Sequence, residues 1–272
     1  MKKQALFLLT LGALVALLGL FWIWRTPQKE GSLDLSKQFE EKPLNHLGII
    51  MDGNRRWAKQ HGFKPWIGHE EGVGPIKTTV KFCLKYHIPY LTLYVFSLEN
   101  FKRPEQEVSY LFDILAQKVA SEEFETLYKE GVKLQFIGDR SRFPAKLISL
   151  INDLEEKTKN NSNLTLSLLF CYGGQQELVA GVQTLCEQAR AGKLDPQTIT
   201  YEQFIGALWS HTLPPLDLVI RTAGDQRLSN FLPLQAGYSE LYFIPCYWPE
   251  VSEKELEEAA LYYLNHERRF GK

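Results

Sequence analysis

Apolar residues beyond position 45 fall into two alternating kinds of segment. Short runs rich in β-branched and aromatic residues predict strands at 46–51, 90–96, 132–137, 164–171, 216–220 and 241–244. Longer stretches with helical spacing of apolar residues lie between and after them, at 72–87, 105–130, 144–160, 174–191, 200–209 and 252–267. This alternation predicts an α/β fold, a single domain with a mainly parallel six-stranded sheet covered by helices.

The amino terminus has a different pattern. Residues 5–24 carry no charge, with Lys2 and Lys3 before them and Arg25 after them. Because about 20 apolar residues suffice to cross a bilayer, we expect residues 1–25 to form an N-terminal hydrophobic helix that anchors the protein. A cleaved signal peptide and a helix lying in the membrane interface are the alternatives.

The segment that follows the apolar stretch has no apolar periodicity. Residues 26–44 contain Pro27, Gly31 and several charges, which is typical of a linker. The remaining residues, 45–272, then form the folded domain.

Charge and cysteine content narrow the class of protein. Lysine and arginine number 31 against 32 aspartates and glutamates, a net charge of -1 that argues against broad binding to nucleic acid. The four cysteines lie far apart without a Cys-x-x-Cys pair, so we expect reduced thiols in a cytosolic setting. A structural disulfide is the less favoured alternative.

Polar clusters follow three of the predicted strands. Residues 52–56 (Asp-Gly-Asn-Arg-Arg) follow the first strand, 97–100 (Ser-Leu-Glu-Asn) the second, and 221–224 (Arg-Thr-Ala-Gly) the fifth. Ligands of open α/β sheets bind outside the carboxyl ends of the strands. The three clusters therefore predict one ligand site.

The first cluster has the composition of an anion site that holds a carboxylate. Backbone amides at a helix start attract phosphate, and the neighbouring Arg55 and Arg56 grip its oxygens. Asp52 makes chemical sense among them if Mg²⁺ bridges it to a diphosphate. An ordinary helix N-cap is the alternative role for Asp52.

A run of motifs in this order resembles the cis-prenyltransferases, the family of undecaprenyl diphosphate synthase. The resemblance starts with His46-Leu47-Gly48-Ile49-Ile50-Met51-Asp52-Gly53-Asn54 and Arg56-Trp57-Ala58-Lys59. It continues through Gly68-His69, Phe96-Ser97, Glu99-Asn100, Arg103-Pro104, Tyr172-Gly173-Gly174, Arg221-Thr222, Arg227-Leu228-Ser229-Asn230 and Glu240-Leu241-Tyr242. It covers residues 46–271, so residues 45–272 would be the catalytic domain.

The resemblance implies repeated condensation of isopentenyl diphosphate onto an allylic diphosphate such as farnesyl diphosphate, with cis double bonds. The polyprenyl diphosphate product would supply the lipid carrier for cell-wall glycan synthesis. Asp52 and Asn100 are the implied catalytic residues, and Asp52 and Glu240 the implied Mg²⁺ ligands. The implied substrate-binding residues are Gly53, Asn54, Arg55, Arg56, Trp57, Lys64, His69, Ser97, Leu98, Glu99, Phe101, Arg103, Arg221, Arg227, Leu228 and Ser229.

Two of these residues keep alternative roles. The resemblance makes Asn100 the proton acceptor, but a neutral amide is a poor base, so it is equally a residue that orients Ser97 or the substrate. Taken alone, Asn100 is also a turn or cap residue. His69 outside such a motif would be an ordinary histidine at a helix edge.

Several positions depart from the family pattern. Arg55 stands where glycine is usual, and Pro65 where many members have arginine, which leaves Lys64 or His61 as substitutes. Phe101 replaces a usual tryptophan. Ala223, Asp225 and Gln226 also differ from the usual residues.

A growing hydrocarbon requires an apolar tunnel. The apolar residues that would line it or belong to the core are Phe82, Leu84, Leu93, Leu111, Phe112, Leu115 and Phe136.

The resemblance also implies a homodimer, paired through the carboxyl-terminal region, in which Arg269-Phe270-Gly271 helps to close the partner's site. With the hydrophobic segment, it predicts contact with membrane lipid at the cytoplasmic face. A non-catalytic partner subunit and a membrane-anchored phosphate-binding regulator are the alternatives. The intact Asp52 cluster argues against the first of them.

Overall fold

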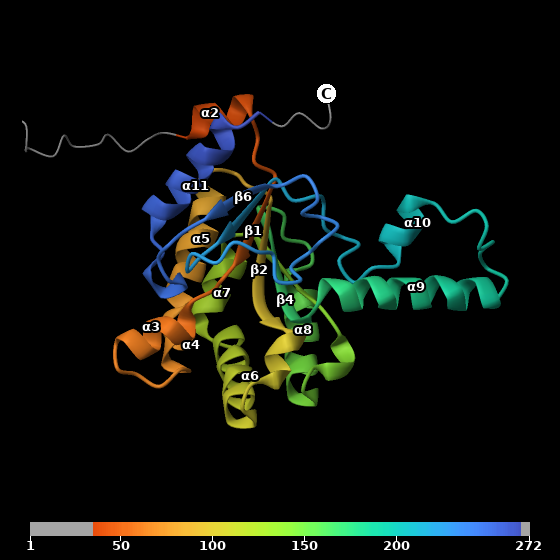
Figure 1. Cartoon of the computed structure of the whole chain (residues 1–272), viewed down its shortest axis with the longest axis horizontal. Coiled ribbons are helices and arrows are strands. Elements are labelled where there is room, and N and C mark those ends of the chain that lie inside the picture. The colour runs from red at the N-terminus through yellow and green to blue at the C-terminus, as the bar shows by residue number, and fades with distance from the viewer. Residues whose placement is uncertain (1–34, 268–272) are drawn as a thin grey trace, which may run out of the picture. The chain divides into compact units, whose positions relative to one another are not determined.

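The fold is a wholly parallel sheet with helices packed on it, seen in a computed structural model that describes residues 35–267 (Figure 1). The strand order is β3-β4-β2-β1-β5-β6, and each neighbouring pair is parallel. The strands are β1 (His46–Ile50), β2 (Tyr90–Ser97), β3 (Val132–Ile137), β4 (Leu164–Tyr172), β5 (Leu218–Arg221) and β6 (Glu240–Phe243). The predicted α/β fold with six parallel strands is confirmed.

Helices lie before, between and after the strands, and those at 36–41 and 67–71 are not among the stretches that the apolar spacing predicts. They are α2 (Ser36–Glu41), α3 (Asn54–Gln60), α4 (Ile67–Glu71), α5 (Val73–Lys85), α6 (Glu105–Val119), α7 (Glu122–Lys129), α8 (Ala145–Thr158), α9 (Gly174–Arg190), α10 (Tyr201–Gly206) and α11 (Glu253–Asn265). Short 3-10 helices are η1 (Leu98–Lys102), η2 (Arg140–Arg142) and η3 (Trp248–Glu250). The single helix expected over 105–130 is wrong, because Ser121 adopts an extended backbone and separates α6 from α7.

Alternation along the strands divides the core between the two faces of the sheet. On the larger face, Leu47, Ile49, Leu91 and Leu93 pack with residues of α5, α8 and α11. On the other face, neighbours such as Ile50 pack under the chain segments around residues 213–219 and 228–236. The sheet is therefore covered by helices on its larger face and partly by loops on the other.

The predicted segments before residue 45 have two outcomes. The hydrophobic helix at 1–25 lies outside the described residues. Part of the expected linker is ordered, because residues 36–41 form α2 and bury Phe39 beside Leu35 in the larger core. Within residues 35–267, no helix is both long enough and apolar enough to cross a bilayer.

β1 lies at the centre of the sheet, where the chain reverses its direction of winding. β2 pairs with one edge of β1 and β5 with the other. Connections from β1 and from β5 therefore leave on opposite sides, which opens a crevice at the carboxyl end of β1. All three polar clusters of the sequence meet at this edge of the sheet.

A glycine contact fixes the helices that follow β1. A Cβ atom on Gly68 of α4 would lie 1.9 Å from the backbone oxygen of Asn54, the first residue of α3. The two helices therefore pack with backbone against backbone, and α4 carries His69 toward the crevice.

Replacing this glycine tests the contact. Gly68→Ala is expected to lower the free energy of unfolding by about 1–3 kcal/mol, because backbone atoms must move to admit the methyl group. Gly206→Ala, at the end of α10 where a Cβ meets no atom within 4 Å, is the matched control and should change stability by less than about 0.5 kcal/mol. Urea denaturation measures both, and equal effects would contradict the predicted close packing.

Candidate active site

Asp52 follows β1 in a turn that holds its carboxylate in a fixed position. Gly53 adopts φ +101°, and a Cβ there would lie 2.6 Å from the Tyr247 ring, so this turn requires glycine. The Gly53 amide donates to Asp52 Oδ1 at 2.7 Å. The N-cap of α3 is Gly53, which excludes the alternative that Asp52 caps this helix.

The backbone of Asp52 is held as firmly as its side chain. Its carbonyl oxygen accepts hydrogen bonds from the Thr222 hydroxyl at 2.6 Å and from the Trp248 amide at 3.0 Å. Thr222 lies 170 residues further along the chain than Asp52, and Trp248 lies further still. The turn is therefore locked between the end of β5 and η3.

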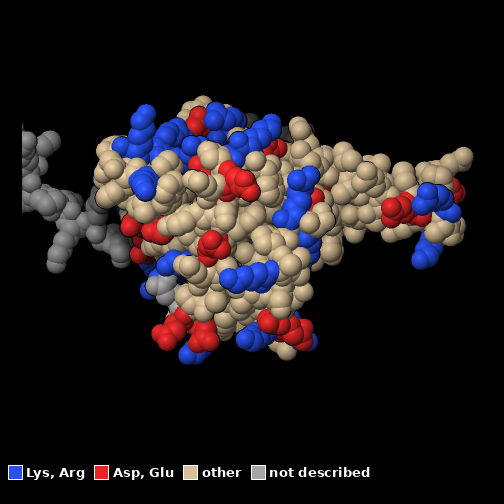
Figure 2. All heavy atoms as spheres, turned by 90° about the horizontal axis from the view of Figure 1, so that it is seen from below, with Lys and Arg blue, Asp and Glu red and all other residues tan. Residues whose placement is uncertain are grey.

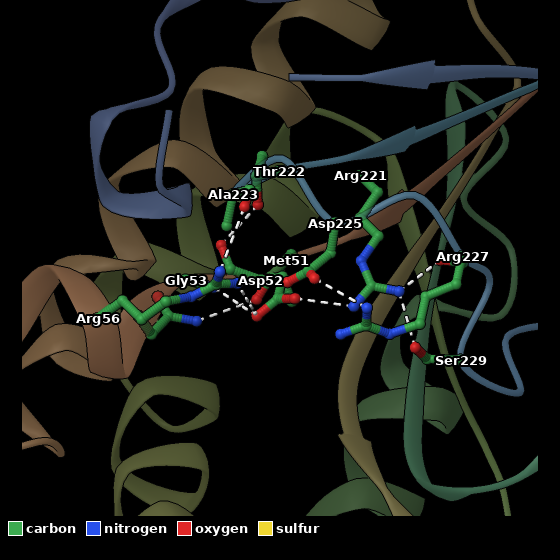
Figure 3. A network of polar contacts seen from close by, with 11 residues as sticks. Met51, Asp52, Gly53, Arg56, Arg221, Thr222, Ala223, Asp225, Arg227 and Ser229 are labelled. Carbon is green, nitrogen blue, oxygen red and sulfur yellow. Dashed lines mark hydrogen bonds and ion pairs between the residues drawn. The ribbon is translucent and has the colours of Figure 1, made fainter. Parts of the chain in front are cut away.

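Arg221, the last residue of β5, connects the clusters (Figure 3). Its Nη2 donates to Asp52 Oδ2 at 2.8 Å, and its Nη1 donates to Ser229 Oγ at 2.7 Å and to the Arg227 carbonyl. The Arg221 side chain is 5% exposed. A buried guanidinium is stable only when charge and hydrogen bonds compensate it, and these partners do so.

A second carboxylate, Asp225, joins the same network. Arg56 Nη2 lies 2.8 Å from Asp225 Oδ2 and 3.2 Å from Asp52 Oδ1, and Arg227 Nη1 lies 2.8 Å from Asp225 Oδ1. Hydrogen bonds from Arg56 and Arg227 lower the pKa of Asp225. Three arginines against two aspartates leave one positive charge in excess, which suits an incoming diphosphate.

The loop after β5 has a strained backbone. Ala223, Ser229, Asn230 and Leu232 are non-glycine residues with φ between +36° and +71°. Such conformations are rare and persist where the surrounding structure imposes them, often at functional sites. Here the strained backbone places Ser229 Oγ within hydrogen-bond distance of Arg221.

The residues after β2 form the facing wall. The Ser97 amide donates to Asn100 Oδ1 at 3.1 Å in a capping box of η1. Asn230 Nδ2 donates to Glu99 Oε1 at 2.9 Å and thereby ties η1 to the β5 loop. Asn100 is therefore a cap residue whose amide oxygen is already engaged.

His69 lies in the same wall as a buried, neutral imidazole. Burial, together with the charges of Arg103 and Arg55, lowers the pKa of His69 to about 3. Its Nε2 has no hydrogen-bond partner among the described residues, and the same holds for Asn54 Oδ1 and Arg221 Nε. Three unpaired buried polar atoms in one site indicate that a polar ligand completes it.

One cavity of about 1060 Å³ joins these polar groups to an apolar interior. The predicted site residues in its wall are Asp52, Gly53, Asn54, Arg55, Arg56, His69, Ser97, Glu99, Asn100, Arg103, Arg221 and Ser229. Its apolar wall comes from β2, β4, α5, α6 and α7 and includes Ile76, Val95, Phe96, Leu111, Ile114, Leu115, Phe124, Leu168 and Phe170. Of the apolar residues left open between tunnel and core, Leu111 and Leu115 lie in the cavity wall, whereas Phe82 and Leu93 are buried in the core.

Other predicted substrate-binding residues lie outside this wall. Trp57 stacks on His61 with ring centroids 4.3 Å apart, and Lys64 lies over the Trp66 ring. Phe101 packs on Phe96. Leu98 and Leu228 pack against the two cores, and Arg227 reaches the site through its backbone and Asp225.

Glu240 does not join Asp52 within the chain. The register pairs Glu240 with Leu218 at the amino end of β5, whereas Arg221, which contacts Asp52, is at the carboxyl end. The Glu240 amide donates to the carbonyl of Asp217, which lies at the same amino edge. Parallel pairing places Asp52 and Glu240 at opposite edges of the sheet, so they do not share a site within one chain, and Glu240 as a Mg²⁺ ligand stays a prediction.

The carboxylate near Asp52 is Asp225, which sequence reasoning noted only as a departure from the family pattern. Asn230 was also not singled out, although it follows Ser229 directly. Neither has a local pattern that marks it, because each acts through a contact with a distant segment.

The site offers few protein ligands for a metal ion. Among residues 35–267, no group of three histidine, cysteine, aspartate or glutamate side chains is placed to hold a metal. Mg²⁺ commonly takes one or two carboxylates together with substrate phosphates and water. Asp52 beside the arginine network fits this mode of binding, with a diphosphate supplying the remaining oxygens.

Comparison with known proteins agrees with this geometry. Residues 50–271 match the family described as putative undecaprenyl diphosphate synthase. The chain is 44% identical over 232 residues to an isoprenyl transferase of Clostridium perfringens, covering 85% of this chain and 91% of that protein. It is 44% identical over 237 residues to the ditrans,polycis-undecaprenyl-diphosphate synthase ((2E,6E)-farnesyl-diphosphate specific) of Salmonella paratyphi A, covering 87% and 94%.

A solved structure is similar over the same region. Lavandulyl diphosphate synthase from Lavandula x intermedia, in complex with dimethylallyl diphosphate, superposes with a TM-score of 0.81 at 33% identity. The match covers 84% of this chain and 98% of that one. The chain therefore belongs to the cis-prenyltransferase family of undecaprenyl diphosphate synthases, and it is an enzyme that transfers prenyl groups.

Proposed function

We propose that this enzyme condenses isopentenyl diphosphate repeatedly onto an allylic diphosphate such as farnesyl diphosphate. The observation that carries this proposal is the single cavity of about 1060 Å³, charged at the Asp52–Arg221 network and apolar beyond it. A prenyl diphosphate has the same division between a charged head and a hydrocarbon tail. The polyprenyl diphosphate formed would be the precursor of a lipid carrier for cell-wall glycans.

The two substrates divide the polar wall between them. Arg221 and Ser229, with Arg227 beside them, hold the diphosphate of isopentenyl diphosphate. Gly53, Asn54, Arg55, Arg56 and His69 surround the allylic diphosphate, whose tail enters the apolar part. The contact between Arg221 and Asp52 brings the two diphosphate positions side by side, which supports transfer from one substrate to the other.

Asp52 is the residue that would hold Mg²⁺ together with diphosphate oxygens. When bound, the metal offsets the charge that develops on the departing diphosphate. Arg56 lies 3.2 Å from the Asp52 carboxylate and can donate to the same leaving group. The low exposure of Arg221 strengthens such charge stabilisation, because little water screens it.

Asn100 positions the substrate and is not the base. Its amide oxygen accepts the Ser97 N–H, so the group left free is an NH₂ donor, which cannot take up a proton. A diphosphate oxygen of the substrate pair is the proton acceptor that remains nearby.

Replacement of Asp52 tests the function. In an assay with farnesyl diphosphate, labelled isopentenyl diphosphate and Mg²⁺, Asp52→Ala is expected to lower the incorporation of label by about 10²–10³-fold or more. The reason is that the substitution removes the carboxylate that would hold the metal and, through it, the diphosphate. Chelation with EDTA should have a comparable effect, reversed by Mg²⁺. The control is Asp153→Ala at an exposed position of α8, and its activity should equal that of the wild type.

Sizing the dephosphorylated products gives the chain length of the polyprenyl product. Incorporation that does not exceed the Asp52→Ala background would reject the enzymatic proposal in favour of a non-catalytic partner subunit or a regulator.

We propose that a second copy of this chain covers α9. This helix extends away from the sheet, and its visible surface carries little charge except at the tip of the arm (Figures 1 and 2). Val179 and Val182, one helical turn apart, are 58% and 51% exposed. Exposed apolar side chains on a projecting helix favour a self-complementary contact. A homodimer is expected from the resemblance, but there it pairs through the carboxyl-terminal region, whereas this proposal places the contact on α9.

Charge placed on this helix tests the dimer. The double variant Val179→Glu/Val182→Glu is expected to elute as a monomer of about half the wild-type mass, because paired helices would bury four carboxylates. The double variant Gln188→Glu/Gln197→Glu adds the same charge at exposed positions, with Gln188 on the opposite side of α9 from Val179 and Gln197 beyond the end of the helix, and it should stay dimeric. Light scattering measures the mass, and a wild-type monomer at all concentrations would contradict the proposal.

We propose that residues 1–25 hold the enzyme at the cytoplasmic face of the membrane. The uncharged stretch at residues 5–24 supports attachment to a membrane, and the hydrocarbon product partitions into lipid. The basic residues on both flanks do not favour either orientation.

Deletion of residues 1–30 tests the tether. The truncated protein is expected to leave the membrane fraction and to release product more slowly into added vesicles, while the first condensation keeps its rate. Sedimentation with vesicles and a product-release assay measure the two effects. Unchanged membrane recovery together with unchanged release would contradict a tether.

A further inference from the structure

Glu107, in the first turn of α6, is a buried carboxylate behind the cavity wall. It is 4% exposed and does not line the cavity. Its Oε1 lies 3.4 Å from Arg55 Nε and 3.4 Å from Arg103 Nη1. One carboxylate oxygen is therefore shared by two guanidiniums that come from α3 and from the end of η1.

Both arginines face the cavity that Glu107 does not reach. Arg55 and Arg103 line the wall together with His69, whose Nε2 has no partner among the described residues. Arg55, Arg103 and Glu107 taken together carry one positive charge in excess. This charge stands apart from the excess charge of the Arg56, Arg221 and Arg227 network.

Arg55 is the less restrained of the two arginines. Its side chain is 50% exposed against 23% for Arg103, and the contact with Glu107 is its only ion pair among the described residues. A free arginine side chain carries considerable rotamer entropy. A fixed carboxylate behind it therefore reduces the entropy lost when an anion binds in front.

The position of Arg55 also bears on a departure in the sequence. Pro65 lines the same cavity where the family pattern has arginine, and Arg55 stands where the pattern has glycine. Arg55 thus brings a guanidinium to the wall that Pro65 cannot supply.

We propose that Glu107 is a positioning residue that holds Arg55 and Arg103 at the cavity wall, so that both guanidiniums bind the diphosphate of the allylic substrate. The proposal rests on the proposed function of this cavity. Arg55 then takes the place of the guanidinium missing at position 65.

Positioning and simple electrostatics predict opposite results for the neutral variant E107Q. Removing a negative charge behind the arginines makes the wall more positive, which alone would tighten the binding of an anion. If Glu107 acts by holding the guanidiniums, its loss weakens binding instead, because both arginines lose their anchor and repel each other. A purely structural role would lower the melting temperature and leave substrate binding unchanged.

The experiment measures binding of a non-reacting thio analogue of farnesyl diphosphate to the full chain by calorimetry, in parallel with steady-state kinetics. For E107Q, the Kd of the analogue and the KM of farnesyl diphosphate should rise by about tenfold, the loss typical of a charge-assisted hydrogen bond. The KM of isopentenyl diphosphate should change by less than about twofold, because the ion pairs of Glu107 are with Arg55 and Arg103 and not with Arg221. Unchanged or tighter analogue binding would overturn the proposal.

Further variants connect the effect to Arg55. R55G should raise the Kd of the analogue by a similar factor. The double variant R55G/E107Q should raise this Kd by less than the product of the two single fold-changes. R55G/P65R should recover part of the affinity, whereas P65R alone tests whether an arginine at 65 can reach the site. If the losses of affinity caused by R55G and E107Q simply multiply in the double variant, the assignment of Glu107 is overturned. If E107Q does not fold, the affinity of R55G for the analogue still shows whether Arg55 binds the diphosphate.

The same measurements separate this proposal from the proposed function. Wild-type enzyme that incorporates isopentenyl units while E107Q binds the analogue normally would overturn only the role of Glu107. If the wild type neither binds the analogue nor incorporates label, the proposed function itself is contradicted, whatever E107Q does.

Discussion

The contact between Arg221 and Asp52 joins two of the polar clusters of the candidate active site. It links the ends of β5 and β1, neighbours in the sheet but about 170 residues apart in sequence. Because the Arg221 guanidinium is almost fully buried, it needs the Asp52 carboxylate, the Ser229 hydroxyl and the Arg227 carbonyl together. The loops after β1 and β5, which we propose bind different diphosphates, are thereby held in one hydrogen-bonded network.

The sheet explains why a charged and an apolar surface meet here. Each parallel strand alternates its side chains between the faces and ends at the same edge. β2 carries Val95 and Phe96 into the cavity wall and then reaches Ser97 at the polar edge. A substrate with a diphosphate head and a hydrocarbon tail fits this geometry without a separate binding domain.

Local sequence patterns determined much of this picture. Apolar periodicity predicted the six strands and most helices, because it depends only on which residues face a core. The clusters at residues 52–56, 97–100 and 221–224 were found because parallel strands bring their carboxyl ends to one edge. The helix over 105–130 was predicted as one, since apolar spacing continues through the break at Ser121.

Patterns along the chain were enough to predict the order of strands and helices, the polar clusters at the strand ends, and the family whose motifs these clusters match. Which side chains meet could be seen in the folded chain alone. It placed Asp225 near Asp52 and Glu240 at the opposite edge, it engaged the Asn100 oxygen in a cap, and it put Glu107 behind two arginines. The physical reason is that periodicity is a property of neighbours along the chain. Strand register and ion pairing depend on segments that lie far apart in sequence.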